Sequence, residues 1–483
     1  MKTLCVIRMA ALLITAILLA TSFNLAGATQ NTLLPPIGMG LNLVPTPGST
    51  SPYALDVNQD GKLDLVSLAI NTRLKAEIVV QLGNGDGTFG KPLTTALAQP
   101  ASAMILGDMN GDGIPDAVIQ DFDVIYVALG HGDGTFGPEI TSSAIGTILA
   151  FATGDFNGDG KLDLALSLQG EVAIMLGNGD GTLQAPVVAP GGSTQNISIA
   201  TGDFNLDHKL DVAIVDNIDA AVVVFLGNGD GTLQAPTSYA TTTGPLFLVV
   251  DDFNGDGKPD IVVDEVGKSG ANLSHFLGNG DGTFQTRVDQ VSVQDSGGLL
   301  AADFNGDGVL DVAVLSPSRD LVQIWLGTGD GSFSLGGYFP DSTQSATQAF
   351  EFTSGDFNRD GKTDVAALDQ IGQSYSVLLQ GNSIVSPAAL IFGTVTIGTS
   401  KSLKTTLTNT SNAAFTITST KVAGDTTDFH QTNNCGSSLA SGASCTITVT
   451  FKPASATIKP ASVNILDGGI QGTQEVALSG SAR

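Results

Sequence analysis

The sequence has little positive charge and few histidines. Its 483 residues include 20 Lys and Arg against 47 Asp and Glu, so the formal net charge is −27 at pH 7. A chain this acidic is a poor partner for nucleic acid and for anionic membrane surfaces. Its four histidines fall at unrelated positions and form no metal or acid–base cluster: His131, His208, His275 and His430.

Cysteine and tryptophan are also scarce. Of three cysteines, Cys5 lies before an N-terminal apolar run in a segment that we expect to be cleaved, which leaves Cys435 and Cys445. In a secreted protein we expect such a close pair to form one disulfide. A metal–thiolate site would need more ligands than His430 nearby. The single Trp325 precedes a glycine-rich turn, where we favour a packing role over a sugar-stacking platform.

Residues 1–28 read as a secretory signal peptide. Lys2 and Arg8 form a short basic segment, residues 9–20 are apolar, and Ala26 and Ala28 provide the small residues of a cleavage site. An uncleaved anchor is the alternative, but the apolar run is short for a bilayer and no later segment approaches transmembrane length. We therefore expect a secreted or cell-surface protein that does not insert in the membrane after cleavage.

One acidic nonapeptide recurs along the chain. It reads Asp-x-Asn-x-Asp-[Gly/His]-x-x-Asp and begins at Asp56, Asp108, Asp155, Asp203, Asp252, Asp303 and Asp356. The interval is about 50 residues, and a fixed period of that size indicates a repeat architecture. The repeat also concentrates the acidic residues in loops instead of spreading them over the surface.

Each repeat contains the signals of four short strands. Two apolar runs follow the nonapeptide, and the second ends in a turn spelled Leu-Gly-Asn-Gly-Asp-Gly-Thr-Phe at residues 82–89 and 277–284. Asn-Gly and Asp-Gly between apolar residues are a strong hairpin signal. Four strands repeated seven times match the blades of a β-propeller, whereas the coils of the alternative, a β-solenoid, are usually shorter.

We therefore predict an all-β protein, with a seven-bladed β-propeller in residues 29–385 and an immunoglobulin-like β-sandwich in residues 386–483. The seventh repeat lacks the glycine-rich tip, but an extra apolar stretch lies at residues 37–44. We expect this stretch to complete the seventh blade and close the ring, removing exposed sheet edges. The tail is rich in Thr and Ser and alternates in polarity, which favours a sandwich over a disordered stalk.

The nonapeptide predicts a calcium site in every blade. Calcium prefers six to eight hard oxygens, which side chains at loop positions 1, 3 and 5 and a carbonyl at position 7 can supply. Glycine at position 6 suits the sharp turn that this requires. The predicted ligands are Asp56, Asn58, Asp60, Asp64, Asp108, Asn110, Asp112, Asp116, Asp155, Asn157, Asp159, Asp163, Asp203, Asn205, Asp207, Asp211, Asp252, Asn254, Asp256, Asp260, Asp303, Asn305, Asp307, Asp311, Asp356, Asn358, Asp360 and Asp364.

The alternative is a polar turn without metal, but without a cation the clustered carboxylates would repel one another. His208 replaces glycine in the fourth loop, so we predict the weakest site there. Extracellular calcium modules bind at about 10⁻⁴ to 10⁻³ M. At ten times the dissociation constant each site contributes about 1.4 kcal/mol. We therefore expect calcium (Ca²⁺) to be a structural clamp, not a catalyst.

The nonapeptide and its turns resemble the FG-GAP repeat, also called the VCBS-type repeat in bacterial proteins and found in integrin α heads. The resemblance runs through residues 154–163 and through Phe136, Gly137 and Pro138. It implies a seven-bladed, calcium-bearing propeller used for adhesion, carbohydrate recognition or protein recognition. Integrin heads carry calcium in only some blades, whereas all seven loops here keep the ligands. The integrin partner domains are absent, so integrin function does not transfer.

The tail resembles the bacterial choice-of-anchor D or ASH-like immunoglobulin domain. The matching segments are residues 390–393, 407–410, 428–429, 434–436, 442–447 and 451–453. This resemblance implies a structural or interaction module without an active site.

The sequence contains no complete catalytic motif that we recognise. Residues 85–91 match parts of a dinucleotide fingerprint and a P-loop, but Pro92 replaces the required Ser or Thr and no helix follows. We therefore expect a non-enzymatic, monomeric recognition, adhesion or scaffold protein that binds a polysaccharide or an extracellular protein. The alternatives are a propeller-based lyase or hydrolase and a purely structural envelope component.

Overall fold

The computed structural model describes residues 37–40, 52–70, 75–142, 146–192, 196–267, 270–293, 297–316, 321–340, 349–369, 374–378, 383–386, 389–409, 414–440, 442–456, 461–467 and 472–483. These residues fold into β-strands and turns. In this part of the chain no helix is long and apolar enough to cross a membrane. The expected signal peptide, residues 1–28, lies outside the described ranges.

Seven four-stranded antiparallel sheets form the first domain. Blade 1 holds β2 (Tyr53–Leu55), β3 (Asp64–Ile70), β4 (Ala76–Gln81) and β5 (Leu93–Ala96); blade 2 holds β6 (Ala103–Gly107), β7 (Asp116–Asp121), β8 (Val124–Ala128) and β9 (Ile140–Thr141); blade 3 holds β10 (Ile148–Gly154), β11 (Asp163–Leu168), β12 (Glu171–Met175) and β13 (Val187–Pro190); blade 4 holds β14 (Asn196–Gly202), β15 (Asp211–Asp216), β16 (Ala221–Phe225) and β17 (Thr237–Ala240).

The remaining blades follow the same order. Blade 5 holds β18 (Pro245–Asp251), β19 (Asp260–Gly267), β20 (Gly270–Phe276) and β21 (Val288–Val293); blade 6 holds β22 (Gly298–Ala302), β23 (Asp311–Ser316), β24 (Leu321–Gly327) and β25 (Phe333–Pro340); blade 7 holds β26 (Ala349–Gly355), β27 (Asp364–Asp369), β28 (Ser374–Leu378) and β1 (Ile37–Gly40). The predicted seven-bladed propeller is confirmed.

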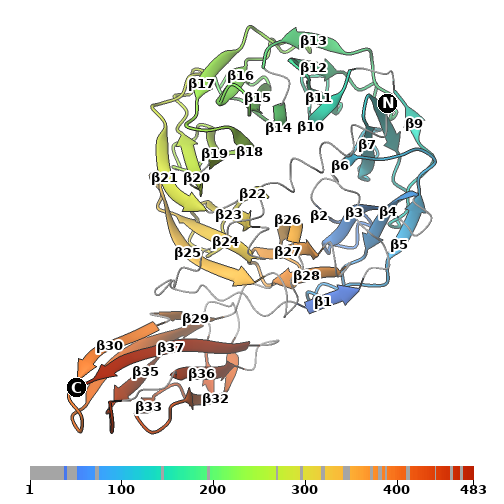
Figure 1. Ribbon diagram of the computed structural model, residues 1–483. Coiled ribbons are helices and arrows are strands. Elements are labelled where there is room, and N and C mark those ends of the chain that lie inside the picture. Colours follow the sequence, from blue (N-terminus) through green and yellow to red (C-terminus); the bar gives the residue numbers. More distant parts are fainter. Residues whose placement is uncertain are drawn as a thin grey trace.

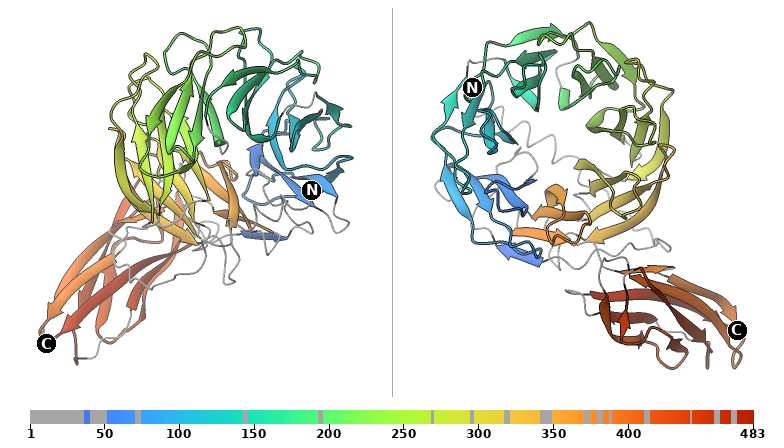
Figure 2. Two further views of the ribbon diagram at one scale, coloured as in Figure 1. Left: turned by 45° about the horizontal axis from the view of Figure 1, so that its top comes forward. Right: turned by 180° about the vertical axis from the view of Figure 1, so that it is seen from behind.

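The sheets stand radially around the centre of the ring. The first strand of a blade, such as β10 or β14, lies near the centre, and the fourth, such as β13 or β17, lies at the rim (Figures 1 and 2). The described second strand β11 is buried throughout, whereas β13 is largely exposed. The near-continuous apolar runs after each nonapeptide therefore belong to strands that are covered on both faces.

Each interface between neighbouring blades has its own apolar cluster. Between blades 4 and 5, for example, Phe204, Val215 and Ile261 pack with Phe276 and Phe284. The interface between blades 7 and 1 is built in the same way, around Phe357, Leu65 and Val377. The core is thus a ring of separate clusters, so every blade depends on both neighbours for burial.

The N-terminal strand closes the ring. β1 pairs antiparallel with β28, with Ile37 opposite Val377 and Gly40 opposite Ser374. It takes the rim position that the fourth strand takes in the other blades. This confirms that residues near Ile37 complete the seventh blade. Residues 41–44 of the predicted stretch lie outside the described ranges.

The second domain is the expected β-sandwich, which projects from the rim beside β25 to β28 (Figures 1 and 2). Its sheets contain β29 (Ser383–Ser386), β31 (Lys401–Asn409), β35 (Ser444–Phe451) and β33 (Phe429–Asn433), and β30 (Ala389–Val395), β37 (Gly472–Ala482), β36 (Ala461–Asp467), β32 (Phe415–Gly424) and β34 (Ser438–Leu439). The expected boundary at residue 386 falls within β29, because β29 pairs with β31 and the composition shifts only at its end.

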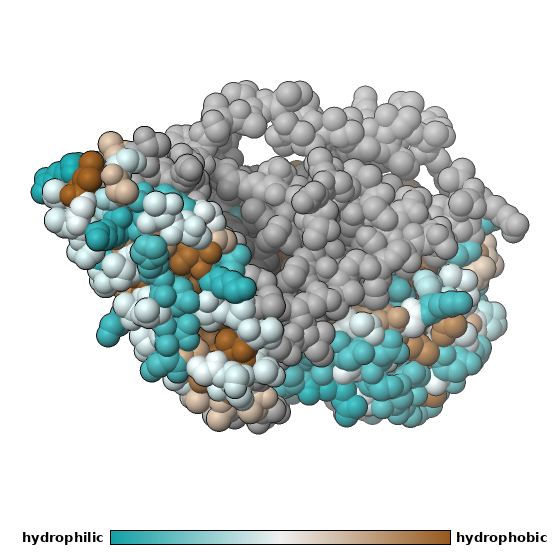
Figure 3. All heavy atoms as spheres, turned by 90° about the horizontal axis from the view of Figure 1, so that it is seen from below, coloured by the Kyte–Doolittle hydropathy of each residue, from teal (hydrophilic) through white to brown (hydrophobic). Residues whose placement is uncertain are grey.

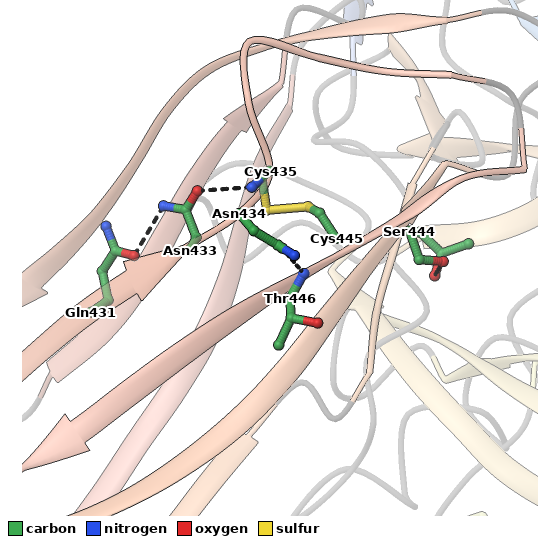
Figure 4. Close-up of a disulfide and its surroundings, with 8 residues drawn as sticks. Gln431, Asn433, Asn434, Cys435, Ser444, Cys445 and Thr446 are labelled. Carbon is green, nitrogen blue, oxygen red and sulfur yellow. Dashed lines mark hydrogen bonds between the residues drawn. A yellow bond between two sulfur atoms is a disulfide. The ribbon is translucent and has the colours of Figure 1, made fainter.

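The sandwich core contains stacked aromatic rings and a buried disulfide. The rings of Phe429 and Phe451 stack with centroids 4.5 Å apart. Cys435 and Cys445 are bonded, which confirms the expected pair (Figure 4). Beside it, Asn434 Oδ1 accepts the Thr446 N–H at 2.7 Å, so the chain before Cys435 is also tied to β35.

Seen from below, the described surface is mainly hydrophilic, with isolated hydrophobic residues (Figure 3). This view shows no broad apolar face over the coloured part of either domain. Single exposed apolar residues are normal on a soluble domain. For a binding site, the type and position of an exposed apolar residue therefore matter more than the number of such residues.

Candidate functional site

The seven nonapeptides occupy equivalent positions. Each connects the first strand of a blade to the second, and each ninth aspartate is the first residue of that second strand. In blade 3, β10 ends at Gly154, the loop begins at Asp155, and β11 begins at Asp163. All seven loops therefore lie on one face of the propeller, which we call the loop face.

The side chains at positions 1, 3 and 5 turn into the loop. In blade 3, Asp155 Oδ1 accepts the Gly158 N–H at 2.8 Å and Asp155 Oδ2 accepts the Gly160 N–H at 2.8 Å. Asn157 Oδ1 accepts the Asp159 N–H at 2.9 Å, and Asp159 Oδ1 accepts the Lys161 N–H at 3.0 Å. The predicted first, third and fifth ligands are thus brought together around one turn.

Two positions in each loop adopt the left-handed conformation. Position 6 was expected to do so, and His208 adopts φ 65° while its N–H still reaches Asp203 Oδ2 at 2.8 Å. Position 4 is also left-handed, with φ 58° at Gln59, 57° at Leu206 and 61° at Arg359. The signal for position 4 was present in the sequence, since the other four loops have glycine there.

The ninth aspartate has a role that the metal hypothesis did not foresee. Asp163 is fully buried; its Oδ2 accepts the Phe156 N–H at 2.8 Å and its Oδ1 accepts the Gly177 N–H at 2.7 Å. Gly177 begins the glycine-rich turn of the same blade. The same pair of bonds is made by Asp64, Asp116, Asp211, Asp260 and Asp311, and Asp364 makes the first of them. The ninth residue therefore fastens the loop to the hairpin tip.

These buried carboxyls are costly to ionise. Burial raises the pKa of Asp163, the two N–H groups oppose that rise, and the charges of Asp159 and Asp155 add to it. The same causes raise the pKa of Asp311 to about 7. The carboxylates of one loop are therefore close enough to destabilise one another, and a cation would relieve that repulsion.

By chemical type the loop donors fit calcium. Positions 1, 3 and 5 provide hard carboxylate and amide oxygens, and each oxygen that accepts one N–H keeps a second lone pair. Within the described ranges, however, no three His, Cys, Asp or Glu side chains are grouped as they would be around a bound ion. The reason lies in the loop itself, because position 3 is an amide and the ninth carboxylate is directed to the tip.

Lysine at position 7 divides the loops into two kinds. The ammonium group pairs with the position-5 aspartate in four loops, as Lys62 does with Asp60 at 2.9 Å and Lys161 with Asp159 at 3.4 Å. The same pair forms in blades 4 and 5. Blades 2 and 6 have Ile114 and Val309 there, and the position-5 oxygen accepts an amide N–H from Asn110 or Asn305. Blade 7 has Lys362 at this position, and its Asp360 Oδ2 also accepts an amide N–H, from Asn358 at 3.2 Å.

The hairpin tips also fasten neighbouring blades. The N–H of Gly231 in the blade 4 tip donates to the carbonyl of Phe156 in the blade 3 loop at 3.2 Å. Gly231 has a φ of 81°, which disfavours any other residue, and a Cβ there would lie 2.9 Å from Leu176 Cδ2 of blade 3, so Leu176 would have to shift. Equivalent bonds join Gly181 to Met109, Gly282 to Phe204, and Gly87 to Phe357. The last of these closes the ring from blade 7 to blade 1.

A shallow cavity of about 550 Å³ lies where the first and seventh loops meet. Asp56 and Lys62 line one side, and Asp356, Arg359 and Asp360 line the other. The loop carboxylates thus face space that an ion can reach from solvent. The predicted packing role of Trp325 is confirmed, since its side chain is buried among Phe253, Leu273 and Phe333.

Two sequence families match the chain. The family described as FG-GAP-like repeat matches residues 56–119, 108–166, 203–263 and 303–367. The family described as abnormal spindle-like microcephaly-associated, ASPM-SPD-2-Hydin (ASH) matches residues 379–473. No curated protein matches the chain.

Several solved structures match parts of the chain. BBS1N, determined in complex with ARL6DN, superposes with a TM-score of 0.52 at 12% identity, covering 72% of this chain and 97% of its own. An Agrocybe aegerita lectin that recognises non-reducing terminal N-acetylglucosamine gives a TM-score of 0.46 at 19% identity, covering 71% and 97%. The ASH/PapD-like domain 7 of human CEP192 gives 0.17 at 15% identity, covering 21% of this chain and 85% of its own. The first of these supports the propeller fold.

Proposed function

The chain is a β-propeller of FG-GAP-like repeats with a C-terminal ASH domain, and from this architecture we propose that it is a secreted, non-enzymatic recognition or scaffold protein whose blades are stabilised by calcium. The observation that carries the calcium proposal is the loop geometry. In blade 3, Asp155, Asn157 and Asp159 point their oxygens into one turn, next to a buried and costly Asp163. The other six loops repeat this residue set.

The two kinds of loop predict an order of affinity. Where lysine is present, its ammonium already offsets one carboxylate and competes with a metal ion. Loops 2 and 6 have no such internal cation, since Ile114 and Val309 take the place of lysine. We therefore propose that loops 2 and 6 bind calcium most tightly. The fourth loop, with Lys209 and the left-handed His208, is expected to bind most weakly.

Calorimetric titration of the mature full chain with CaCl₂ tests this proposal, together with melting in calcium and in EDTA. At ten times the dissociation constant each occupied site adds about 1.4 kcal/mol, so the melting temperature should rise strongly with calcium. Ile114→Lys should remove one of the tighter sites, and the matched change Lys161→Ile should tighten a weaker one. A melt that is the same in calcium and in EDTA would overturn the calcium proposal.

The recognition surface lies away from the loops, because the nonapeptides and tips are occupied in holding blades together. We propose an extracellular polysaccharide or protein as the partner. A glycan array probed with and without calcium tests the polysaccharide arm, and capture of extracellular proteins on the immobilised chain tests the other. Turnover in a lyase and hydrolase screen would replace this proposal with an enzymatic one.

A further inference from the structure

The face opposite the loops presents the turns between the second and third strands. In blade 2, β7 begins at Asp116 on the loop face and runs to Asp121, and β8 returns from Val124. The turn Phe122–Asp123 therefore lies on this opposite face. Asp121 is paired with Val124, so the turn is a tight two-residue connection.

Phe122 is unusual in both conformation and exposure. Its φ is 47°, a left-handed value that non-glycine residues rarely adopt, and 53% of the residue is exposed. The other large hydrophobic residues that are exposed in the described ranges are Val, Leu and Ile. The backbone at Phe122 is held in place, because its carbonyl accepts the Ile148 N–H of blade 3 at 2.8 Å. The fold thus presents an aromatic ring to solvent where glycine would be the easier choice.

Polar residues lie in this turn and at the same end of blade 2. Asp123 in the same turn is exposed. Asp121 is paired with Val124 across the same turn. Burial raises the pKa of Tyr126, and the charges of Asp121, Asp123 and Glu139 raise it further. The Ser142 N–H donates to the Ile125 carbonyl at 2.9 Å, so Ser142 lies at the same end. Its hydroxyl is buried and has no hydrogen-bond partner among the described atoms.

We propose that Phe122 is the stacking platform of a glycan-binding site on the face opposite the loops, with Asp123 as a hydroxyl acceptor. An aromatic face provides flat apolar area at low entropic cost, and a carboxylate accepts hydrogen bonds from hydroxyls. The negative charge of Asp121 and Asp123 in and beside the turn disfavours uronic acids and sulfated sugars, so the ligand is a neutral glycan. This inference rests on the proposed recognition function and specifies its ligand class.

The test compares variants of the mature full chain in calcium-containing buffer. Phe122→Gly removes the ring but suits the positive φ, so its melting temperature should equal or exceed that of the wild type. Phe122→Asn, another residue that tolerates this conformation, provides a second variant. Ile218→Ala is the matched control, because Ile218 is 54% exposed in the corresponding turn of blade 4. The probes are neutral hexasaccharides of glucose, mannose, xylose and N-acetylglucosamine, with hexagalacturonate as the anionic comparison.

We expect the wild type and Ile218→Ala to bind at least one neutral hexasaccharide, and both Phe122 variants to bind it at least about ten-fold more weakly, as for truncation of a central aromatic contact. Equal binding by wild type and Phe122→Gly would overturn the platform and leave glycan recognition intact. Preference for hexagalacturonate would overturn the neutral-ligand assignment. If the wild type bound no glycan while capturing a protein, the platform would be refuted and the protein arm of the proposed function retained.

Discussion

Replacing one ninth aspartate separates its fastening role from metal binding. Asp163→Ala removes a fully buried carboxylate and leaves the N–H groups of Phe156 and Gly177 without acceptors. A hydrogen bond to a charged group contributes about 1.5 to 3 kcal/mol, so two give roughly 3 to 6 kcal/mol. The cost of burying the carboxylate, seen in its raised pKa, offsets part of this. We expect a net loss of about 3 kcal/mol, a large fraction of the typical 5 to 15 kcal/mol of a domain.

The measurement is denaturant unfolding of the mature chain at pH 7.5, in excess EDTA and again in excess calcium. The control is Asp155→Ala in the same loop. Asp155 accepts only N–H groups of its own exposed turn, so its loss should cost about 1 kcal/mol in EDTA, as for a lost cap. In calcium, Asp155→Ala should also forfeit the stabilisation from one site.

The decisive comparison is therefore made without metal. If Asp163→Ala were no more destabilising than Asp155→Ala in EDTA, and the two became costly only in calcium, the ninth aspartate would be simply a ligand. The fastening argument would then be wrong. A large effect of Asp163→Ala in both buffers would support it.

Two further predictions concern the ring and its core. Deleting residues 29–45 removes β1 from its pairing with β28, so the melting temperature should fall sharply, and an unchanged melt by differential scanning calorimetry would refute closure by this strand. His275 is 4% exposed, and burial lowers its pKa from 6.5 despite the charges of Asp330 and Asp289. Its contribution to stability is therefore present above pH 6.5 and is lost as the pH falls through the lower folded-state pKa, by at most about 1.4 kcal/mol per pH unit. His275→Phe, measured by urea unfolding between pH 7.5 and 5.0, should remove that loss; an identical pH profile would contradict it.

The repeat made the fold predictable, because seven copies of one pattern repeat the same local signals. Strand order, hairpin tips and the closing strand at Ile37 all follow from turn chemistry and alternation. The role of Asp163 could not be read in the same way, since an acidic residue at a ligand spacing looks like a ligand. Only its position at the start of a buried strand hinted at a structural task.

Contacts between neighbouring repeats were even harder to predict from the sequence. The glycines of each tip were explained by positive φ, yet Gly231 must also accommodate Leu176 of the preceding blade. The packing role predicted for the single Trp325 is confirmed, but the sequence did not show that its partners Phe253 and Leu273 come from the preceding blade. Nothing in the sequence set Phe122 apart from the other 21 of the 22 phenylalanines. Its exposure follows from its place in the turn, which only the structure shows.

The ring is closed in two places, at the rim and on the loop face. At the rim, β1 completes the seventh sheet through pairing with β28. On the loop face, the Gly87 N–H donates to the Phe357 carbonyl at 3.0 Å, and the rings of Phe89 and Phe357 meet edge to face. The second closure repeats the bond found between other blades. The interface between blades 7 and 1 is therefore held like the other interfaces, and the pairing of β1 with β28 adds to it. Calcium, if bound, would tighten loops that already hold the wheel together through their own aspartates.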